Sequence, residues 1–580
     1  QCISHASPPM KSSGLYEDYL NLEELLTQYQ ENGDEKTRKI IGEMAEELHL
    51  QPSISEMGME LYRIKRRLIP HGLHIMDRQP GREQMVAYLL GVLRMDREFP
   101  SILKLISLEE GHKLDKIKNK GHSAREEKAK NIIKSIINGK ISSGFPEGYG
   151  EYVHEIISNI KESREAEGLL RALDGNYIIP SRGGDPIRDP EVYPTGRAMY
   201  AFDPRQIPTV AAEVRGQHAA ELLVDSYLEN HGGYPRRVGI VLWGFETLKT
   251  GGDTIATILA LMGMRIKHQK GAWFKNLEVI PLDELGRPRI DVTVTICGIF
   301  RDTMATHIDF INRAIRRVAQ LDEPVKMNYP RRHYLEDAEK LGDLAMARIF
   351  GPAPTEYATS MRSRVENGNW EEEEELVESY QDSMSYAYQE GSITQSTAAF
   401  NRALQRVDLV TQERDNTEYE VTDLDHYYEF LGGLSRTIES QRGEKVDIMV
   451  VDSTEEDVRV ENLSETIQRA SRTRLLNPAW IDGMLNHEFH GAQKVQNSLE
   501  YLLGFAATTG KVENWLFEEA ADKLLFDEDM RRRIQENNPY SAVKMGEILL
   551  ETERRGYWEA DEQKIKELRD IVVDMDAELE

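Results

Sequence analysis

Short, continuous apolar runs mark the middle of the chain and predict buried strands. The run at 238–243 is followed by a glycine-containing turn and then by an amphipathic helical pattern. Further apolar strands are predicted at 277–282, 290–296 and 446–451, with a second amphipathic helix at 308–318. Strands and helices that alternate in this way predict βαβ units and a mainly parallel sheet.

Helical patterns flank this region on both sides. Residues 1–170 and 463–580 carry apolar positions at near-helical spacing between charged residues. The predicted fold class is therefore α/β, a parallel-sheet core of βαβ units flanked by N-terminal and C-terminal helical regions. We expect a helical region at 1–170, an α/β domain at 171–462 that carries the binding site, and a helical region at 463–580. A long insertion at about 330–440 is expected to interrupt the α/β domain.

Composition and charge narrow the possible partners. The 580 residues include 100 acidic and 72 basic side chains, a formal net charge of -28, which argues against nucleic acid as a partner. No apolar run approaches the roughly 18 residues of a membrane span, and the first residues lack the pattern of a secretion signal. Cys2 and Cys297 are too far apart in the sequence for a disulfide framework or a thiolate zinc site. We therefore expect a cytoplasmic protein with no membrane span.

Two loops after predicted strands are candidates for ligand contact, because open α/β sheets bind ligands beyond the carboxyl ends of their strands. The first runs from Trp243 into Thr250–Asp253, where backbone N–H groups at a helix start could bind an anion. Such glycine-rich turns are also common without a ligand. In the second loop, Arg301 could clamp a carboxylate, or it could form a structural pair with Asp302.

A phosphate-binding loop for ATP is not expected in this chain. The segment Gly504–Lys511 comes close to the Walker A pattern. It has one residue too many between its glycines, and Val512 stands where a Ser or Thr would ligate magnesium. We therefore expect that this chain does not hydrolyse ATP.

The densest group of reactive side chains lies between residues 415 and 433. It comprises Asp415, Glu418, Glu420, Asp423, Asp425, His426 and Glu429, with Tyr419, Tyr427 and Tyr428 among them and Gly432-Gly433 at its end. A charge run of this kind can be a solvated face. A site that passes a hard divalent cation and accepts protons instead needs oxygen ligands and a base of near-neutral pKa, and the histidine and tyrosines favour that interpretation.

The segment Tyr193–Thr209 is too irregular for a helix and too rich in proline for a disordered tail. It resembles, nearly residue for residue, a signature of the cobaltochelatase large subunit (CobN) and magnesium chelatase H subunit family. Other segments that look like blocks of this family follow the family order: Leu68–His74, Gly183–Arg188, Leu242–Gly244, Gly286–Val292, Phe300–Asp302, Leu321–Pro324, Arg348–Gly351, Asn477–Trp480 and Arg555–Trp558. The resemblance covers essentially the whole chain and corresponds to the C-terminal half of the family.

The resemblance implies a substrate-binding, catalytic large subunit of an ATP-dependent chelatase that inserts a divalent metal into a tetrapyrrole. Asp423, Asp425 and Glu429 are expected to relay metal or accept protons, with His426 as base and with Asp425 and Glu429 as metal ligands. The residues expected to bind the tetrapyrrole are Asp185, Arg197, Asp203, Arg205, Trp243, Arg301 and Asp302. Among these, the arginines would bind the acidic side chains of the tetrapyrrole, and Trp243 would line the ring face.

The family also implies partners. ATP would be hydrolysed by a separate AAA+ motor subunit acting with an integrin-like adaptor subunit, which agrees with the missing Walker A loop. Family members are about twice as long, and upstream they carry a Leu-Glu-Trp-Leu-Pro-Gly-Lys segment whose Glu is important for chelation. We expect either that a separate N-terminal half is supplied by another polypeptide, or that the chain is a fragment or a divergent form inactive alone.

The metal is expected to be cobalt, for cobalamin biosynthesis. Asp425–Gly433 is closer to the cobalt-branch pattern Asp-Asp-Tyr-Tyr-Gln-Phe-His-Gly-Gly, although His426, Glu429 and Leu431 depart from it, whereas the magnesium branch has His-Tyr-Phe-Asp. One alternative is a magnesium chelatase H subunit that acts on protoporphyrin IX. An alternative of another class is a noncatalytic tetrapyrrole-binding scaffold that lacks the N-terminal half.

Overall fold

The computed structural model of the chain divides into two compact units. The described residues are 15–51, 53–67, 76–95, 97, 99–109, 122–140, 145–182, 186–187, 189–200, 204–267, 276–416, 419–454 and 457–579. The first unit is Gln1–Phe202 with Glu455–Asp457, and the second is Asp203–Thr454 with Val458–Glu580. The three domains expected from the sequence stay a prediction.

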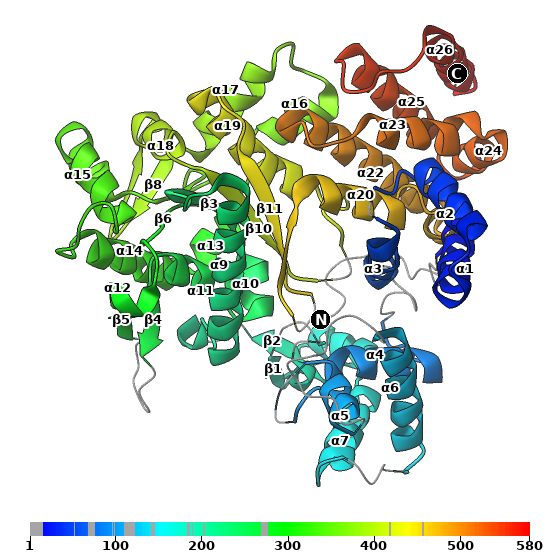
Figure 1. Ribbon diagram of the computed structural model, residues 1–580, viewed down its shortest axis with the longest axis horizontal. Helices are drawn as coiled ribbons and strands as arrows, with labels where there is room; N and C mark the ends of the chain where they lie inside the picture. Colours follow the sequence, from blue (N-terminus) through cyan, green and yellow to red (C-terminus); the bar gives the residue numbers. More distant parts are fainter. Residues whose placement is uncertain are drawn as a thin grey trace. The chain divides into compact units, whose positions relative to one another are not determined.

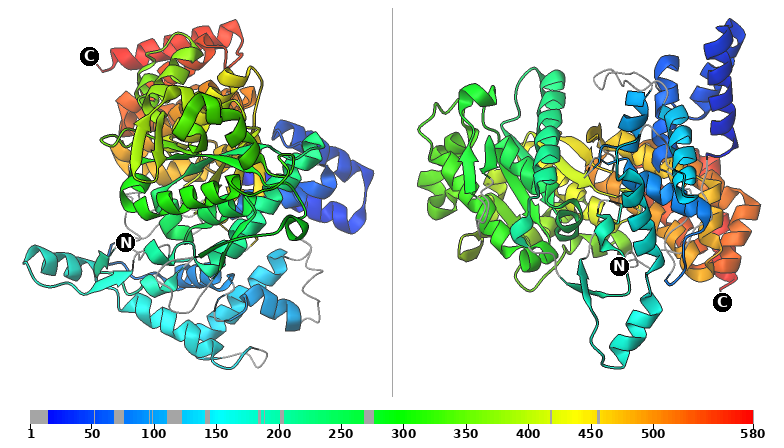
Figure 2. Two further views of the ribbon diagram at one scale, coloured as in Figure 1. Left: turned by 90° about the vertical axis from the view of Figure 1, so that its left-hand side faces the viewer. Right: turned by 90° about the horizontal axis from the view of Figure 1, so that it is seen from below.

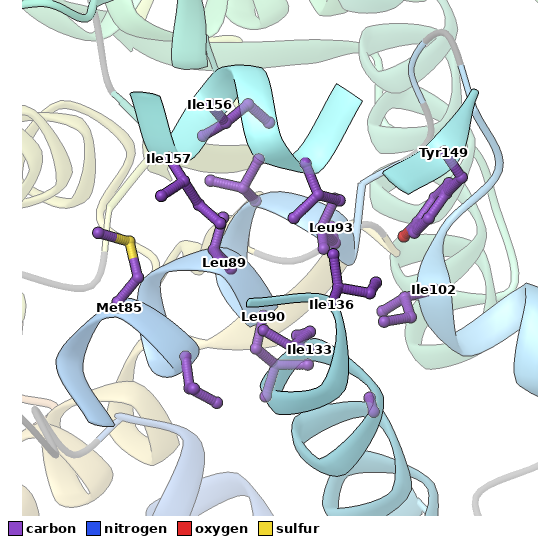
Figure 3. Packing of buried hydrophobic residues seen from close by; sticks show 14 of the residues in the cluster. Met85, Leu89, Leu90, Leu93, Ile102, Ile133, Ile136, Tyr149, Ile156 and Ile157 are labelled. Carbon is purple, nitrogen blue, oxygen red and sulfur yellow. The ribbon is translucent and has the colours of Figure 1, made fainter. Parts of the chain in front are cut away.

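The first unit is largely helical and contains two hydrophobic clusters. Its helices are α1 (Glu17–Asn32), α2 (Glu35–Glu47), α3 (Ile54–Arg67), α4 (Arg82–Leu93), α5 (Ile102–Glu109), α6 (His122–Ile137), α7 (Tyr149–Lys161) and α8 (Glu165–Leu173). Helices α1–α3 enclose one cluster around Leu22 and Ile41. Helices α4–α7 enclose the other, in which Leu89, Ile133 and Ile156 meet (Figure 3). A short parallel pair, β1 (Pro180–Arg182) and β2 (Ala198–Tyr200), follows.

The second unit is built on a mixed, largely parallel sheet of eight strands in the order β12-β11-β10-β3-β6-β7-β8-β9. Its strands are β3 (Arg237–Leu242), β6 (Asp291–Ile296), β7 (Ile349–Gly351), β8 (Tyr386–Gln389), β9 (Ser392–Gln395), β10 (Leu409–Arg414), β11 (Asp447–Asp452) and β12 (Arg459–Asn462). The five strands from β11 to β7 are mutually parallel, whereas β12, β8 and β9 join antiparallel at the edges. Every residue of β3, β6 and β10 is buried, as expected for strands covered on both faces.

Helices cover both faces of this sheet (Figure 1). They are α9 (Val210–His231), α10 (Gly244–Thr250), α11 (Asp253–Leu261), α12 (Leu282–Leu285), α13 (Gly298–Thr303), α14 (Ala305–Ala319), α15 (Tyr329–Leu341), α16 (Met361–Asn367), α17 (Glu373–Met384), α18 (Thr397–Leu404) and α19 (Gly433–Arg442). Helices α9, α11 and α14 pack together, and α17, α18 and α19 form a second group. The predicted class, a parallel-sheet α/β core with helical flanks, is confirmed.

The C-terminal helices belong to the same unit as the sheet. They are α20 (Leu463–Thr473), α21 (Pro478–Leu485), α22 (Glu488–Thr509), α23 (Asn514–Ala521), α24 (Glu528–Asn537), α25 (Pro539–Arg554) and α26 (Glu562–Ala577). Helix α22 packs against α16, α17 and α19, and the group is drawn in orange to red in Figures 1 and 2. Among the described helices, none has the length and apolar character that a bilayer span requires.

Two segments differ from the strand predictions. The predicted strand at 277–282 is β5 (Asn276–Val279), which pairs antiparallel with β4 (Met264–Lys267) in a separate two-stranded sheet. Its side chains stay partly exposed, unlike those of strands that are covered on both faces.

The expected insertion at about 330–440 supplies β7, β8, β9 and β10 to the main sheet. These strands are short or carry polar residues, which hid them in the apolar pattern.

The sheet has a topological switch point between β3 and β10. From β3 the chain adds β6 and β7 on one side, and β10 and β11 lie on the other side. Because these strands are parallel, their carboxyl ends meet at one edge. Open α/β sheets bind their ligands in the crevice at such a point.

Candidate active site

The two loops that leave β3 and β10 meet at the switch point. Trp243 follows β3 directly and precedes α10. The loop after β10 carries Asp415 to His426 and runs into η5 (Tyr427–Gly432), a π-helical turn that continues as α19. π-Helical turns are often found at functional sites. The rings of Trp243 and His426 lie 5.4 Å apart between centroids, which places the two loops side by side.

His426 stands between two carboxylates. Its Nδ1 lies 3.1 Å from Asp425 Oδ1 and 3.3 Å from Glu429 Oε2. Asp425 is in turn paired with Arg362, whose guanidinium nitrogen lies 2.5 Å from Oδ2. The structure therefore brings Asp425, His426 and Glu429 together, as the sequence predicted for one site, and adds Arg362 from α16.

Glu429 is fully buried and is held in place by a distant loop. The backbone N–H and the hydroxyl of Thr359 both donate to Glu429 Oε1 at 2.7 Å. Thr359 lies in the loop that follows β7. Because these two donors occupy Oε1, the second carboxylate oxygen is left to face the imidazole of His426.

The charges around His426 favour its protonated form. Burial alone would lower its pKa, but the hydrogen bond with Glu429 and the negative charges of Asp425 and Glu429 outweigh it, so the pKa is raised above its usual value. The positive charge of Arg362 opposes this rise. About 45% of the side chain is exposed, and no described residue hydrogen-bonds its Nε2. The imidazole can therefore exchange a proton with a bound molecule or with solvent.

Aromatic rings lie beside the imidazole. Trp243 is partly exposed and packs on Phe430, with centroids 4.6 Å apart and planes at 60°. Its indole Nε1 is buried, and the described residues supply no hydrogen-bond partner for it. An unpaired buried N–H is uncommon in folded proteins.

Asp423 has other partners. Its Oδ2 accepts from the Glu420 backbone N–H at 2.8 Å and lies 3.2 Å from Arg474 Nε. Burial raises the pKa of Asp423, and the charge of Arg474 acts against this rise. The second oxygen is buried, and the described residues provide no partner for it. Asp423 is thus paired with Arg474, whereas Asp425 is paired with Arg362, and the part of Asp423 in metal relay stays a prediction.

Arg301 and Asp302 form a pair. Arg301 Nε lies 2.7 Å from Asp302 Oδ1, and Arg301 Nη1 donates to the carbonyls of Ala353 and Glu356 at 2.6 and 2.8 Å. The hydrogen bond with Asp302 raises the pKa of Arg301. These contacts correspond to the structural pair, one of the two alternatives left open by the sequence. A role for Arg301 in binding a substrate carboxylate stays a prediction.

The other residues predicted to bind the tetrapyrrole are less defined. Arg197 and Arg205 are both exposed, the first in the first unit and the second in η3 (Pro204–Gln206) of the second unit. Asp185 and Asp203 lie outside the described residues. Binding by these residues stays a prediction.

In the turn Thr250–Asp253, backbone N–H groups already donate to an acceptor within the protein. Thr250 Oγ1 accepts from the backbone N–H groups of Gly252 and Asp253 at 3.2 and 3.1 Å. The Thr209 N–H donates to the Gly251 carbonyl at 2.9 Å, and a Cβ at Gly252 would lie 2.6 Å from the Ile207 side chain. The end of the Tyr193–Thr209 signature therefore packs on this turn, which leaves these amides engaged with the protein.

Sequence reasoning missed the residues that support the histidine from other elements. Thr359 and Arg362 lie far from Glu429 in the chain, and neither belongs to a recognisable motif. Glu246 and Glu413, both buried at the same edge, were also missed because each is a single acidic residue in an otherwise ordinary segment. Among the described residues, no group of three or more His, Cys, Asp or Glu side chains is arranged to hold a metal ion.

Comparisons with known proteins give one consistent result. The family model described as CobN/Magnesium Chelatase matches residues 1–565. A magnesium-chelatase subunit ChlH of Oryza sativa subsp. indica is 30% identical, across 100% of this chain and 47% of its own length. An aerobic cobaltochelatase subunit CobN of Sinorhizobium sp is 35% identical, across 70% of this chain and 33% of its own length.

A solved structure has the same fold. The catalytic subunit of cobaltochelatase from Mycobacterium tuberculosis superposes with a TM-score of 0.89 at 28% identity, across 98% of this chain and 52% of that one. The chain thus spans about half the length of the rice relative and of the mycobacterial structure.

Proposed function

Because the chain belongs to the CobN/magnesium chelatase family, we propose that it is the substrate-binding, catalytic part of a large subunit that inserts a divalent metal, cobalt by preference, into a tetrapyrrole. The observation that carries the proposal is the imidazole of His426, held between Asp425 and Glu429 at the switch point of the sheet. Exchange of pyrrole protons for a dication requires a proton acceptor and anionic oxygen ligands side by side. This cluster contains both.

The proton balance gives His426 its role. Insertion breaks two pyrrole N–H bonds, forms metal–nitrogen bonds, and releases two protons for each dication that enters the ring. Nε2 would accept these protons in turn and pass them to solvent, while Asp425 and Glu429 at Nδ1 stabilise the imidazolium between transfers. Asp425 and Glu429 would also lend oxygen ligands to the cation as it sheds water, and Asp423 would serve the same relay.

The proposed ring site is the partly exposed aromatic surface beside His426. Trp243 would lie against the ring face, since its indole already packs with Phe430 next to the imidazole. As the resemblance implies, Arg197, Arg205 and Arg301 would each bind acidic side chains of the tetrapyrrole, and Asp185, Asp203 and Asp302 would also take part in binding it. For Arg301 this requires that it exchange some of its bonds to Asp302 and to the backbone.

The proposed complex contains partners. ATP would be hydrolysed by an AAA+ motor subunit together with an integrin-like adaptor, and the half of the relatives that this chain does not span would be supplied in the same complex. Support comes from the family match over residues 1–565.

Metal insertion by the reconstituted complex tests the proposal. We expect His426→Ala to lower the insertion rate on the order of a hundredfold, the usual range for loss of a general base. His231→Ala is a matched control, because His231 also pairs with an aspartate and its side chain is also 45% exposed. Equal rates for wild type and His426→Ala would contradict the proposal.

The metal is decided by a second pair of assays. Cobalt with a corrin precursor and magnesium with protoporphyrin IX are offered to the same complex, with and without the upstream half. Support for cobalt comes from the similarity of Asp425–Gly433 to the cobalt-branch pattern. Turnover of magnesium and protoporphyrin alone would replace the cobalt proposal by the magnesium one.

A noncatalytic tetrapyrrole-binding scaffold is the second candidate. A scaffold would bind a tetrapyrrole but insert no metal in any reconstitution, including one with the upstream half. Spectroscopic titration with the tetrapyrrole, run beside the insertion assay, separates the two functions.

A further inference from the structure

Each of the four carboxylate oxygens of Asp425 and Glu429 has a polar partner within the chain. Thr359 donates to Glu429 Oε1 from both its N–H and its hydroxyl. Glu429 Oε2 and Asp425 Oδ1 face Nδ1 of His426, at 3.3 and 3.1 Å. Asp425 Oδ2 lies 2.5 Å from Nη1 of Arg362. A cation that enters this cluster must therefore displace one of these partners.

Arg362 is the partner that can leave most readily. Thr359 holds a fully buried carboxylate, and one of its two donors is a backbone N–H that cannot turn away. The imidazole of His426 stands between two carboxylates. The side chain of Arg362, by contrast, is 43% exposed, so the guanidinium can move into solvent without opening the core. Asp425 Oδ2 is thus the oxygen that an entering cation can reach.

A second carboxylate lies within reach of Arg362. Its Nε donates to Glu366 Oε1 at 2.5 Å, one helical turn further along α16. Residues four apart share one face of a helix, so this pair is kept whether or not Asp425 is bound. Glu366 is itself 30% exposed. Arg362 can therefore release Asp425 and keep its other ion pair.

A guanidinium and a divalent metal ion cannot share Asp425. A single and a double positive charge a few ångström apart repel each other even in water, and more strongly beside a buried cluster. Departure of Arg362 removes this repulsion and frees a carboxylate oxygen next to a second carboxylate, Glu429. Carboxylate oxygens are the ligands that hard divalent cations accept.

We propose that Arg362 is the resident cation of this cluster, and that its guanidinium covers Asp425 until a dication arrives and then turns to Glu366. This inference rests on the proposed function, because it concerns the entry of the metal that the cluster would pass to the tetrapyrrole. The arrangement in which no described group of three His, Cys, Asp or Glu side chains is placed to hold a metal ion is then the closed one. Arg362 controls access and is neither a ligand nor a proton acceptor.

A resident guanidinium favours divalent over monovalent metal ions. Exchange of Arg362 for Na⁺ or K⁺ replaces one positive charge by another and gives up a charge-assisted hydrogen bond. Exchange for a dication adds a positive charge beside two carboxylates. The cluster should therefore discriminate against monovalent ions before any tetrapyrrole is bound.

Titration of the full chain with Co²⁺ alone tests the proposal. Binding is followed by the visible absorption of Co²⁺ and by calorimetry, without tetrapyrrole, ATP or partner subunits. We expect Arg362→Gln to bind Co²⁺ about tenfold more tightly than wild type, because a positive charge no longer opposes the metal at Asp425. Equal or weaker binding by Arg362→Gln, with its fold checked by circular dichroism, would overturn the proposal.

Arg364→Gln is the matched control. Arg364 lies on the same helix and is 40% exposed, but it pairs with Glu375 instead of Asp425. We expect its affinity for Co²⁺ to equal that of wild type. A tenfold gain in this variant as well would show that the gain does not come from the guanidinium at Asp425, and the role of Arg362 would be wrong.

The place of the metal is tested by adding Asp425→Asn to Arg362→Gln. If the gain arises at Asp425, the double variant should bind Co²⁺ no more tightly than wild type. A gain that survives in the double variant would place the metal elsewhere and overturn the proposal.

Movement of the guanidinium can be followed in the unmodified chain, whether or not the Gln variant folds. The NMR signal of the Arg362 Nε–H is assigned by its loss in Arg362→Lys, and Mg²⁺ serves as a diamagnetic probe. We expect saturating Mg²⁺ to shift this signal and to leave that of Arg364 in place. An unshifted Arg362 signal in the Mg²⁺-bound chain would contradict the displacement.

Glu366→Gln tests the second step, the transfer of the guanidinium. Without this carboxylate the displaced Arg362 has no acceptor, so we expect the affinity for Co²⁺ to fall severalfold. The loss should largely disappear when Arg362 is already Gln, because no guanidinium then needs an acceptor. An equal loss in both backgrounds would mean that Glu366 attracts the metal by its own charge, and the transfer would be wrong.

The proposed function and the role of Arg362 fail separately. If the reconstituted complex inserts no metal while Arg362→Gln still gains Co²⁺ affinity at Asp425, the proposed function fails and the role of Arg362 stands. If insertion proceeds while wild type and Arg362→Gln bind Co²⁺ equally, the role of Arg362 is wrong and the proposed function stands.

Discussion

The protonation of His426 depends on side chains from two segments that are far apart in the sequence. Burial works to lower its pKa, Asp425 and Glu429 raise it, and Arg362 lowers it. Asp425 and Glu429 are neighbours of His426 in the sequence, so their grouping was predicted. Arg362 lies on α16, and nothing in the sequence places it against Asp425. The local motif thus identified the base, and the tertiary structure supplied the charge that tunes it.

Glu429→Gln should lower the pKa of His426. The amide can still accept from Thr359, but it carries no negative charge to stabilise the imidazolium. The pKa is measured from the pH dependence of the imidazole NMR signals. Glu420→Gln is the control, because Glu420 is also fully buried but pairs with Arg414. An unshifted His426 signal in Glu429→Gln would show that this carboxylate does not act on the imidazole.

Arg362→Ala should move the same pKa upward. This substitution removes the positive charge that opposes protonation of His426, and it leaves Asp425 without its ion-pair partner. Arg364→Ala, on the same helix, is the matched control because Arg364 pairs with Glu375 instead. The two substitutions at 362 and 429 must shift the NMR titration in opposite directions. A shift of the same sign would show that Glu429 and Arg362 do not act on the imidazole with opposite charges.

At the scale of elements, the position of the site depends on how η5 packs against α22. Gly504 of α22 faces the ring of Tyr428, and a Cβ at that position would lie 2.6 Å from Tyr428 Cγ. The absence of a side chain lets the long helix approach the turn that carries Glu429. The sequence shows a glycine in a helical pattern at this position but gives no sign of the ring that it meets.

Gly504→Ala should therefore destabilise the chain. An added methyl group in a packed contact costs about 1–3 kcal/mol, more than the gain in helix propensity. Chemical denaturation measures the loss. Gly233→Ala is the control, since a Cβ there meets nothing within 4 Å and its φ is not positive. Equal free energies of unfolding for the two variants would mean that η5 and α22 can move apart without loss of stability.

At the scale of the whole sheet, a buried ion network lies at the amino end of β3 and β6, away from the proposed site. Asp291 is fully buried, with Arg237 Nε at 3.0 Å, Arg348 Nε at 2.9 Å and His333 Nδ1 at 2.7 Å. Burial works to raise the pKa of Asp291, but the two arginines and the histidine hold it well below its usual value. At the amino end of these strands, the charge of Asp291 is thus balanced by arginines. At the carboxyl end lies His426, which can gain and lose a proton.

His333 should make the fold acid-sensitive. Burial, together with the charge of Arg237, lowers its pKa from 6.5 to about 4, so the unfolded chain takes up a proton before the folded chain does. Stability therefore falls as the pH drops from 6.5 to 4, by roughly 3 kcal/mol from this group. His333→Gln should lack this part of the fall in denaturant unfolding, whereas His231→Gln, at an exposed site, should retain it. Parallel curves for wild type and His333→Gln would exclude this role.

The family and the α/β class could be derived from the sequence because both depend on local patterns. Apolar runs such as 238–243 must be covered on both faces, and family segments such as Tyr193–Thr209 are contiguous. The grouping of Asp425, His426 and Glu429 was equally accessible, since one turn of chain holds all three. The polar strand β10, by contrast, was hidden because its residues do not follow the apolar pattern.

Only the tertiary structure decided which side chains act on these residues. Parallel strands bring together segments that are separated by whole helices, so Trp243 meets His426 across the switch point. Thr359 and Arg362 come from yet another strand connection. The sequence determines the chemical type of each side chain. The charge state of a side chain depends on its burial and on its neighbours, and only folding determines these.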